Sequence, residues 1–194
     1  MDESKKGILI VVSGPSGAGK STLIERFLRE DDQSSFSVSY TTRQKREHEI
    51  DGRDYHFVSK ERFEEMIGKD SFLEWESVHS YMYGTPKEEV LKTLNTGKDI
   101  ILDIDVKGAL NIQKKCSNAC LIFIEPPATE ELIRRLALRG EQEIDLRMKR
   151  VKEEIASKAL FRYTIINDEL EKAYNRFRET ISEIRRNTNG KNNC

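Results

Sequence analysis

Residues 14–22, with the sequence GPSGAGKST, have types and a spacing that point to phosphate chemistry. They fit G-x-x-x-x-G-K-[ST], a motif that needs a strand before it and a helix after it. An apolar run at residues 7–12 precedes the loop, and a helical pattern over residues 21–30 follows it. Glycines let the backbone curl so that its N–H groups point inward, and the helix start adds a positive dipole end. The loop therefore predicts a binding site for the phosphates of a nucleoside triphosphate.

Two side chains in this loop have expected roles of their own. The Lys20 ammonium should reach the β and γ phosphates, and the Ser21 hydroxyl should coordinate Mg²⁺. The alternative is a glycine-rich strand-to-helix turn with an incidental lysine, and the strand and helix patterns on either side favour the phosphate site. The predicted triphosphate ligands in the loop are Gly14, Pro15, Ser16, Gly17, Ala18, Gly19, Lys20, Ser21 and Thr22.

A second group of polar residues, SYTTRQKR at residues 39–46, is followed by Glu49, Gly52, Asp54 and Tyr55. Arg43 and Arg46 stand three positions apart beside hydroxyl groups and a phenol. Such a grouping can clamp a dianionic phosphate through charge-assisted hydrogen bonds. The alternative is a solvated basic turn, because runs of charged residues usually lie on the solvent-exposed surface.

The apolar pattern predicts the elements that must position these residues. Continuous runs rich in β-branched residues suit strands buried on both faces of a parallel sheet. Because strands and helices alternate, the fold class should be α/β, a parallel sheet sandwiched by helices. The runs lie at residues 7–12, 100–104, 121–124 and 164–166, and the helical patterns lie at residues 21–30, 106–115, 130–138, 144–160 and 170–186.

Residues 36–84 break the alternation and look like an inserted subdomain of mixed α and β structure. The short strand-like pieces there are residues 36–40, 55–58 and 72–75, with helices at 60–67 and, leading back to the core, 86–95. An arginine-rich stretch, residues 134–150, suits a mobile cover over the site. We therefore expect one domain over residues 1–194, with a core at 1–35, 86–128 and 160–194, an insert at 36–85 and a lid at about 129–159.

Composition excludes several classes of function. The chain has 194 residues, and 33 basic residues balance 34 acidic ones to give a net charge of -1. A nonspecific nucleic-acid binder would carry a basic surplus, so no nucleic-acid partner is expected. No apolar run is long enough to cross a membrane, which predicts a cytoplasmic protein with no membrane partner. The three cysteines and three histidines lack the spacing of a zinc site.

The insert and the next core strand carry a more specific pattern. The sequence S-x-T-T-R-x-x-R-x-x-E-x-x-G-x-D-Y-x-F begins at Ser39, with FLEW at residues 72–75, YGT at 83–85 and ILDID-x-x-G at 101–108. This pattern resembles guanylate kinase over nearly the whole chain. The resemblance implies a P-loop fold with an inserted GMP-binding subdomain and a helical, arginine-rich lid. It also implies transfer of the γ-phosphoryl group of MgATP to GMP, and to dGMP, in purine nucleotide metabolism, by a monomer or weak homodimer.

The resemblance also implies roles for individual residues. The catalytic residues would be Lys20, Arg43, Arg139 and Arg150. The ATP-binding residues outside the loop would be Arg135 and Arg139 in the lid and Asn167 near the adenine. The residues that bind the GMP phosphate would be Arg43, Arg46, Tyr55 and Tyr83. The residues that contact the rest of GMP would be Ser39, Glu74, Thr85, Asp103 and Asp105.

The chemistry of guanine agrees with these roles. Guanine presents N1–H and the N2 amino group side by side, and one carboxylate such as that of Glu74 can accept both hydrogen bonds. Adenine has a lone pair at N1, which would repel the same carboxylate, and it lacks the O6 to which the Thr85 hydroxyl could donate. The alternative for Glu74 is a surface charge beside a buried Trp75, since exposed glutamates are common.

Several roles stay open from the residues alone. Asp103 and Asp105 end a core strand and could hold metal-bound water or the substrate, but Asp105 could instead cap the following helix. The arginine-rich stretch could be an ordinary solvated helix surface, and within it either Arg147 or Arg150 could be the phosphate contact. A non-catalytic scaffold module with the same fold, or a kinase for another phosphorylated acceptor, would share much of this pattern.

Overall fold

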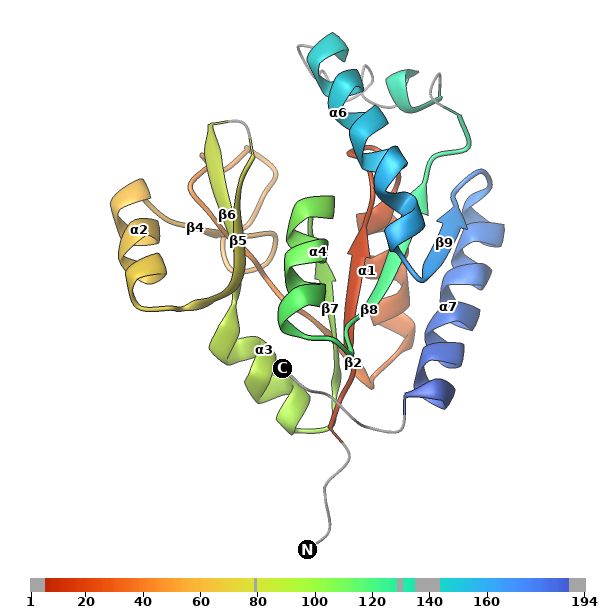
Figure 1. Cartoon of the computed structure of the whole chain (residues 1–194), viewed down its shortest axis with the longest axis horizontal. Helices are drawn as coiled ribbons and strands as arrows, with labels where there is room; N and C mark the ends of the chain where they lie inside the picture. Colours follow the sequence, from red (N-terminus) through yellow and green to blue (C-terminus); the bar gives the residue numbers. More distant parts are fainter. Residues whose placement is uncertain (1–5, 79, 129–130, 135–143, 189–194) are drawn as a thin grey trace, which may run out of the picture.

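The main feature of the fold is a parallel sheet of five strands, in the order β2-β7-β1-β8-β9 (Figure 1). The computed structural model describes residues 6–78, 80–128, 131–134 and 144–188. Every strand pair in the sheet is parallel, so all five strands end at the same edge. The strands are β1 (Leu9–Ser13), β2 (Ser34–Phe36), β7 (Asp99–Asp103), β8 (Cys120–Glu125) and β9 (Tyr163–Ile166).

Helices cover both faces of this sheet, as the continuous apolar runs predict. Along the central strand the side chains alternate in direction. Ile10 and Val12 pack in the cluster with α1 (Lys20–Glu30) and α7 (Leu170–Asn187). Leu9 and Val11 pack in the cluster with α3 (Lys87–Asn95) and α4 (Val106–Lys115). The predicted α/β fold with a sheet between two helical layers is confirmed.

A second, smaller sheet stands to one side of the main sheet in Figure 1 and has the order β4-β3-β6-β5. It is mixed, because β3 and β4 are parallel while the other pairs are antiparallel. Helix α2 (Lys60–Gly68) packs on it through Phe63 and Met66, which form a separate small core with Phe72. The strands are β3 (Tyr40–Thr41), β4 (His56–Phe57), β5 (Phe72–Val78) and β6 (Tyr81–Pro86).

Two predictions about this region differ from the structure. The single strand expected at residues 36–40 is wrong, because Phe36 ends β2 in the main sheet and Tyr40 begins β3 in the small one. Because the two short strands are close in sequence, their residue types do not show that the chain passes from one sheet to the other between them. Strand β6 was missed because Gly84 and Pro86 are typical of turns. A Cβ on Gly84 would lie only 2.7 Å from the Phe72 ring, so the glycine serves close packing between β6 and β5.

Helix α6 (Ile144–Ala156) stands above the edge where the main strands end (Figure 1). Its Val151 packs against Leu132, with Met148 and Ile155 beside them. The predicted helix over residues 144–160 ends as a 3-10 turn, Ser157–Leu160. Of the helix predicted at 130–138, residues 131–134 are helical and the others lie outside the described residues.

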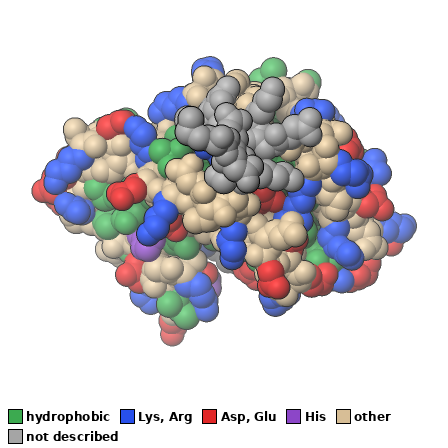
Figure 2. Space-filling view, turned by 90° about the horizontal axis from the view of Figure 1, so that it is seen from below, with side chains coloured by type: hydrophobic (Ala, Val, Ile, Leu, Met, Phe, Trp, Pro, Cys, Tyr) green, Lys and Arg blue, Asp and Glu red, His purple; other side chains and the backbone are tan. Residues whose placement is uncertain are grey.

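Figure 2 shows basic and acidic side chains interspersed on the face seen from below, without a broad area of one sign. Within the described part of the chain, no helix is long and apolar enough to span a membrane.

A polar cluster connects α7 to the end of α1 and to the first residues of β2 and β7. The Arg185 guanidinium donates to both carboxylate oxygens of Asp31 at 2.8 Å and to Asp99 at 2.8 Å. It also contacts the Ser34 hydroxyl at 3.1 Å. The Asp99 carboxylate in turn accepts the backbone N–H of Ile8 at 2.8 Å, and Asp99 is only 6% exposed. Arg185 thus neutralises a carboxylate that is buried where β7 begins.

We expect Arg185→Ala to lower the free energy of unfolding by about 3–5 kcal/mol, because it leaves the buried Asp99 charge without its partner. Urea unfolding at neutral pH measures the loss. Arg186→Ala, at the exposed neighbouring position, is the matched control and should change stability little. A similar small change in both variants would show that the Arg185 cluster does not stabilise the fold.

Candidate functional site

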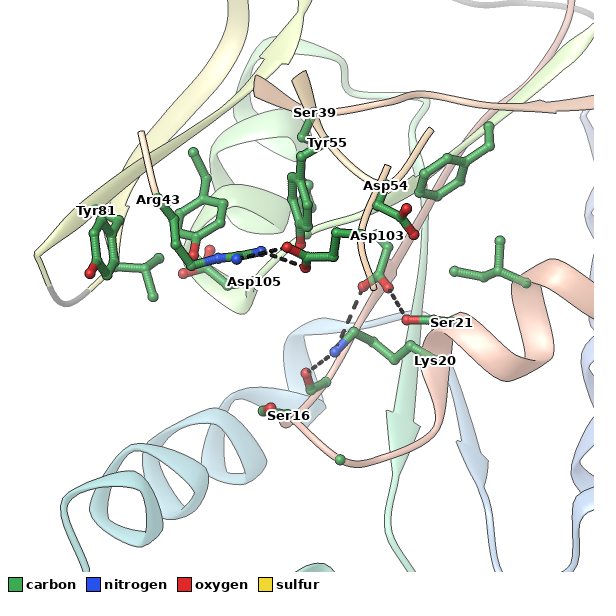
Figure 3. Close-up of a pocket in the computed structure, with 18 of the residues that line it drawn as sticks. Ser16, Lys20, Ser21, Ser39, Arg43, Asp54, Tyr55, Tyr81, Asp103 and Asp105 are labelled. Atoms are coloured by element: carbon green, nitrogen blue, oxygen red, sulfur yellow. Dashed lines mark hydrogen bonds and ion pairs between the residues drawn. The ribbon is translucent and has the colours of Figure 1, made fainter. Parts of the chain in front are cut away.

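A pocket of about 900 Å³ lies at the edge where the main strands end and extends to the small sheet. The phosphate loop lines one end, and Arg43, Tyr55 and Glu74 line the other. Figure 3 shows Lys20 and Ser21 at the start of α1, with Asp103 between them and the Arg43 and Tyr55 side chains. The two polar groups singled out from the sequence therefore face one cavity.

The phosphate loop has the strand–loop–helix context that its motif requires, between β1 and α1. Gly14 and Gly19 have φ values of 134° and 88°, which L side chains rarely adopt. A Cβ on Gly14 would lie 2.2 Å from the Ile124 carbonyl oxygen, so the loop passes too close to β8 for any side chain there. The Lys20 ammonium donates to the Gly14 carbonyl at 2.8 Å.

Asn167, predicted near the adenine, makes a contact with the phosphate loop that the sequence does not indicate. Its side-chain amide donates to the Ala18 carbonyl at 2.7 Å, and its backbone N–H donates to Glu125 at 2.8 Å. A Cβ on Gly19 would lie 2.2 Å from the same amide nitrogen. Asn167 thus braces the loop from the end of β9, and its adenine contact stays a prediction.

Asp103 ends β7, directly opposite Val12 in β1, and so stands beside the phosphate loop. The Ser21 hydroxyl donates to its carboxylate at 3.2 Å, and the Lys20 ammonium lies 3.7 Å from it. Hydroxyl and carboxylate oxygens are the ligands that Mg²⁺ takes in proteins, usually together with water and phosphate. Among the described residues no group of three or more His, Cys, Asp or Glu side chains could hold a metal ion. The chemistry of this pair fits Mg²⁺ bound jointly with a nucleotide.

Glu49 organises Arg43 and Arg46, two arginines at the end of the pocket opposite the phosphate loop. Its carboxylate accepts both Arg43 terminal nitrogens at 2.7 and 2.9 Å and the backbone N–H of Arg46 at 2.8 Å. The hydrogen bonds from Arg43 hold the pKa of Glu49 below its usual value despite its burial. Glu49 belongs to the sequence motif, but no role was predicted for it. Its place three and six residues after two arginines was the available signal.

Tyr55 and Tyr83 line the same end of the pocket, with their rings edge to face at 5.8 Å. The Arg43 guanidinium lies 5.4 Å from the centre of the Tyr55 ring. Burial raises the pKa of Tyr55, and the nearby Asp103 charge raises it further. The phenol therefore remains protonated near neutral pH and can donate a hydrogen bond to an anion.

Glu74 is buried, which overturns its interpretation as a surface charge. It is 5% exposed, whereas its neighbour Trp75 is 42% exposed. The Thr85 hydroxyl donates to its carboxylate at 2.5 Å. Burial raises the pKa of Glu74 to about 7, and the charge of Asp105 adds to the effect while the Thr85 hydrogen bond opposes it. Thr85 is fully buried beside Glu74.

Asp105 caps α4, which is one of the two roles that the sequence allowed it. Its carboxylate accepts the backbone N–H of Gly108 at 2.8 Å. The same side chain lines the pocket with Glu74, so capping does not take it away from the site. The other predicted acceptor residues that line the pocket are Ser39, Arg43, Arg46, Tyr55, Tyr83 and Asp103.

The predicted lid arginines have side chains that lie outside the described part of the chain. Arg135 and Arg139 lie outside the described residues. Arg147 and Arg150 belong to α6, but their side chains lie outside the described part of the chain. From α6, Val151 and Glu154 line the pocket. The choice between Arg147 and Arg150 therefore stays open.

Comparisons with known proteins agree with this geometry. A family model described as guanylate kinase matches residues 6–184. The chain belongs to the guanylate kinase family. It is 45% identical to the guanylate kinase of Caldanaerobacter subterraneus over 184 residues, which is 93% of this chain and 89% of that protein. It is also 45% identical to the guanylate kinase of Thermotoga maritima, over 87% of this chain and 83% of that protein.

A solved guanylate kinase has the same fold. The structure from Anaplasma phagocytophilum matches with a TM-score of 0.80 at 28% identity, covering 97% of this chain and 91% of that one. The resemblance that rested on short motifs is thus confirmed over nearly the whole chain, and the assignment as a transferase of the kinase class with it. The intact phosphate loop, with Lys20 and Ser21 in place, agrees with a catalytic member of the family.

The buried Glu74 predicts a pH-dependent effect on stability. Its pKa is about 7 in the folded protein and near 4.5 when exposed. As pH rises through this window, the unfolded chain releases a proton that the folded protein retains, so the wild type loses stability. Glu74→Gln removes this loss. We expect the variant to be more stable than the wild type by about 1–3 kcal/mol at about pH 8, and by much less at about pH 5.

Urea unfolding at the two pH values measures this difference. Glu88→Gln, at an exposed position of α3, is the control and should show little change at either pH. An equal gain at both pH values would contradict the assignment of the effect to ionisation of Glu74.

Proposed function

We propose that this protein transfers the γ-phosphoryl group of MgATP to GMP, yielding ADP and GDP, and that dGMP serves as an acceptor too. The observation that carries the proposal is the buried Glu74 carboxylate facing the same cavity as the phosphate loop. One end of that cavity suits a triphosphate, and the other offers a carboxylate that can distinguish guanine from adenine. Membership of the guanylate kinase family supports the same reaction.

Guanine would bind with its N1–H and N2 amino group directed at the Glu74 carboxylate. Only the ionised carboxylate can accept both hydrogen bonds, so binding favours release of any proton that Glu74 holds. The Thr85 hydroxyl, which donates to Glu74, would turn toward the guanine O6. Ser39 and Asp105 line the same end and would complete the base site.

The acceptor phosphate would lie against Arg43, Arg46, Tyr55 and Tyr83. Glu49 accepts hydrogen bonds from both terminal nitrogens of the Arg43 guanidinium, which keeps the group in place. The protonated Tyr55 phenol adds a neutral donor beside this charge. Phosphoryl transfer depends mostly on alignment and charge neutralisation, and this preformed clamp supplies both for the acceptor.

The triphosphate would occupy the phosphate loop, with Lys20 leaving the Gly14 carbonyl to contact the β and γ phosphates. Ser21 would hold Mg²⁺ directly, and Asp103 would hold it through water. The ion, when bound, neutralises charge on the phosphates. Lys20, Arg43, Arg139 and Arg150 are the residues that we propose contact the transferred group and stabilise its charge.

The reaction must exclude water, which suggests how the parts of the chain cooperate. We assign the core to residues 1–35, 86–128 and 160–194, the GMP-binding insert to 36–85 and the lid to about 129–159. Arg135 and Arg139 of the lid would cover the ATP phosphates, and Asn167 would lie near the adenine. The protein would act in the cytoplasm as a monomer or weak homodimer.

The direct test is ADP release from ATP with GMP, dGMP, AMP, UMP and dTMP as acceptors, in the presence and absence of Mg²⁺. We expect turnover with GMP and dGMP only, and only with the ion. Strong turnover with AMP and none with GMP would refute the proposal. Binding of ATP without transfer to any acceptor would instead indicate a non-catalytic module.

We expect Lys20→Met to lower kcat by about 10²–10³-fold, because it removes a fixed positive charge from the migrating phosphoryl group. Steady-state kinetics with GMP measures the loss, and thermal unfolding checks that the fold is retained. Lys92→Met, at an exposed position of α3, is the matched control and should turn over as the wild type does. Near-normal turnover in Lys20→Met would remove Lys20 from the mechanism.

A further inference from the structure

One face of α4 is pressed against strand β5, which carries Glu74. Gly108, Asn111 and Lys115 share this face, since they are three and four residues apart on a helix. The Asn111 amide donates to the Glu76 carboxylate at 2.6 Å, and the Lys115 ammonium donates to the Leu73 carbonyl at 2.7 Å. The strand is thus fastened to the helix on both sides of Glu74.

Gly108 stands where Glu74 meets this helix face. A Cβ built on Gly108 would lie 2.7 Å from the Glu74 Oε2 atom, and 3.3 Å from Glu74 Cδ and from Asp105 Oδ1. Real Cβ atoms essentially never approach another heavy atom below 3.0 Å. The Glu74 carboxylate therefore occupies the space that any side chain at position 108 would need.

The backbone gives no other reason for a glycine at this position. Gly108 is not among the residues of positive φ and lies in the first turn of a regular helix. Glycine is the poorest helix former after proline, so alanine would suit the helix itself better. The absence of a side chain is best explained by the neighbouring carboxylate.

The other side of the same carboxylate is held by Thr85. Its hydroxyl contacts Oε1 at 2.5 Å, while Oε2 lies 2.7 Å from the position that a Cβ on Gly108 would take. The Glu74 carboxylate stands between these two contacts at 5% exposure, so its orientation is determined from both sides. We propose that Gly108 is a specificity-determining positioning residue, whose missing side chain keeps the Glu74 carboxylate aimed at the N1–H and N2 amino group of guanine.

This inference rests on the proposed role of Glu74 in binding GMP, and it adds a residue that makes no ligand contact of its own. In Gly108→Ala, the atom that must move is the far end of a flexible side chain rather than backbone. The Asn111 and Lys115 contacts still hold the strand in place. The added methyl group should therefore turn the carboxylate and leave the fold intact.

The experiment compares Gly108→Ala with Gly68→Ala, a glycine-to-alanine change in helix α2 where a Cβ meets nothing within 4 Å. We expect Gly108→Ala to raise KM for GMP roughly tenfold, as expected for a weakened bidentate base contact. KM for ATP should not change, and Tm should not fall. The ratio of kcat/KM for GMP over inosine 5′-monophosphate, which lacks the 2-amino group, should also fall. Gly68→Ala should match the wild type in all four measurements.

A double-mutant cycle tests whether the effect passes through Glu74. In a Glu74→Ala background there is no carboxylate to displace, so adding Gly108→Ala should leave KM for GMP unchanged. An equal rise in both backgrounds, an unchanged KM in Gly108→Ala, or a joint rise for GMP and ATP with a lower Tm would overturn the positioning role. If Glu74→Ala itself binds GMP normally, the proposed base contact fails, and this inference fails with it.

Discussion

The site depends on the parallel pairing of β1 with β7. Val12 and Asp103 stand opposite each other in this pair, so the phosphate loop that follows β1 and the carboxylate that ends β7 emerge side by side. The chain between the two strands contains the whole small sheet, which is thereby carried to the same edge. A shift of this register by one residue would turn Asp103 to the other face of the sheet and separate it from Lys20 and Ser21.

Two buried carboxylates in the pocket have pKa values shifted in opposite directions, for a clear physical reason. Glu49 has a charged partner in Arg43, which lowers its pKa and keeps it ionised. Glu74 accepts a hydrogen bond from the Thr85 hydroxyl instead, and burial outweighs this contact and raises its pKa to about 7. The first arrangement holds the Arg43 guanidinium and the Arg46 backbone in place. The second leaves a carboxylate that lines the pocket with Thr85 on its Oε1 atom, as the guanine contact that we propose requires.

Much of the main fold could be predicted from local patterns. Strands buried on both faces appear as unbroken apolar runs, and α1, α3, α4 and α7 follow from their periodicity and end close to the expected residues. The small sheet was harder to predict, because its strands are short and β6 contains Gly84 and Pro86. The break between Phe36 and Tyr40 was also missed, since neither residue type reports which sheet its strand joins.

The sequence by itself determined the chemistry that this protein can carry. The spacing within residues 14–22 requires a phosphate loop, and the residue types around Arg43 and Glu74 suit a guanine nucleotide. Only the tertiary structure decided which groups act on one another. It placed Asn167 against the phosphate loop and Gly108 against Glu74, over separations that no local pattern spans. Side-chain types and local spacing can be seen in the sequence, whereas contacts between distant residues form only when the strands and helices pack.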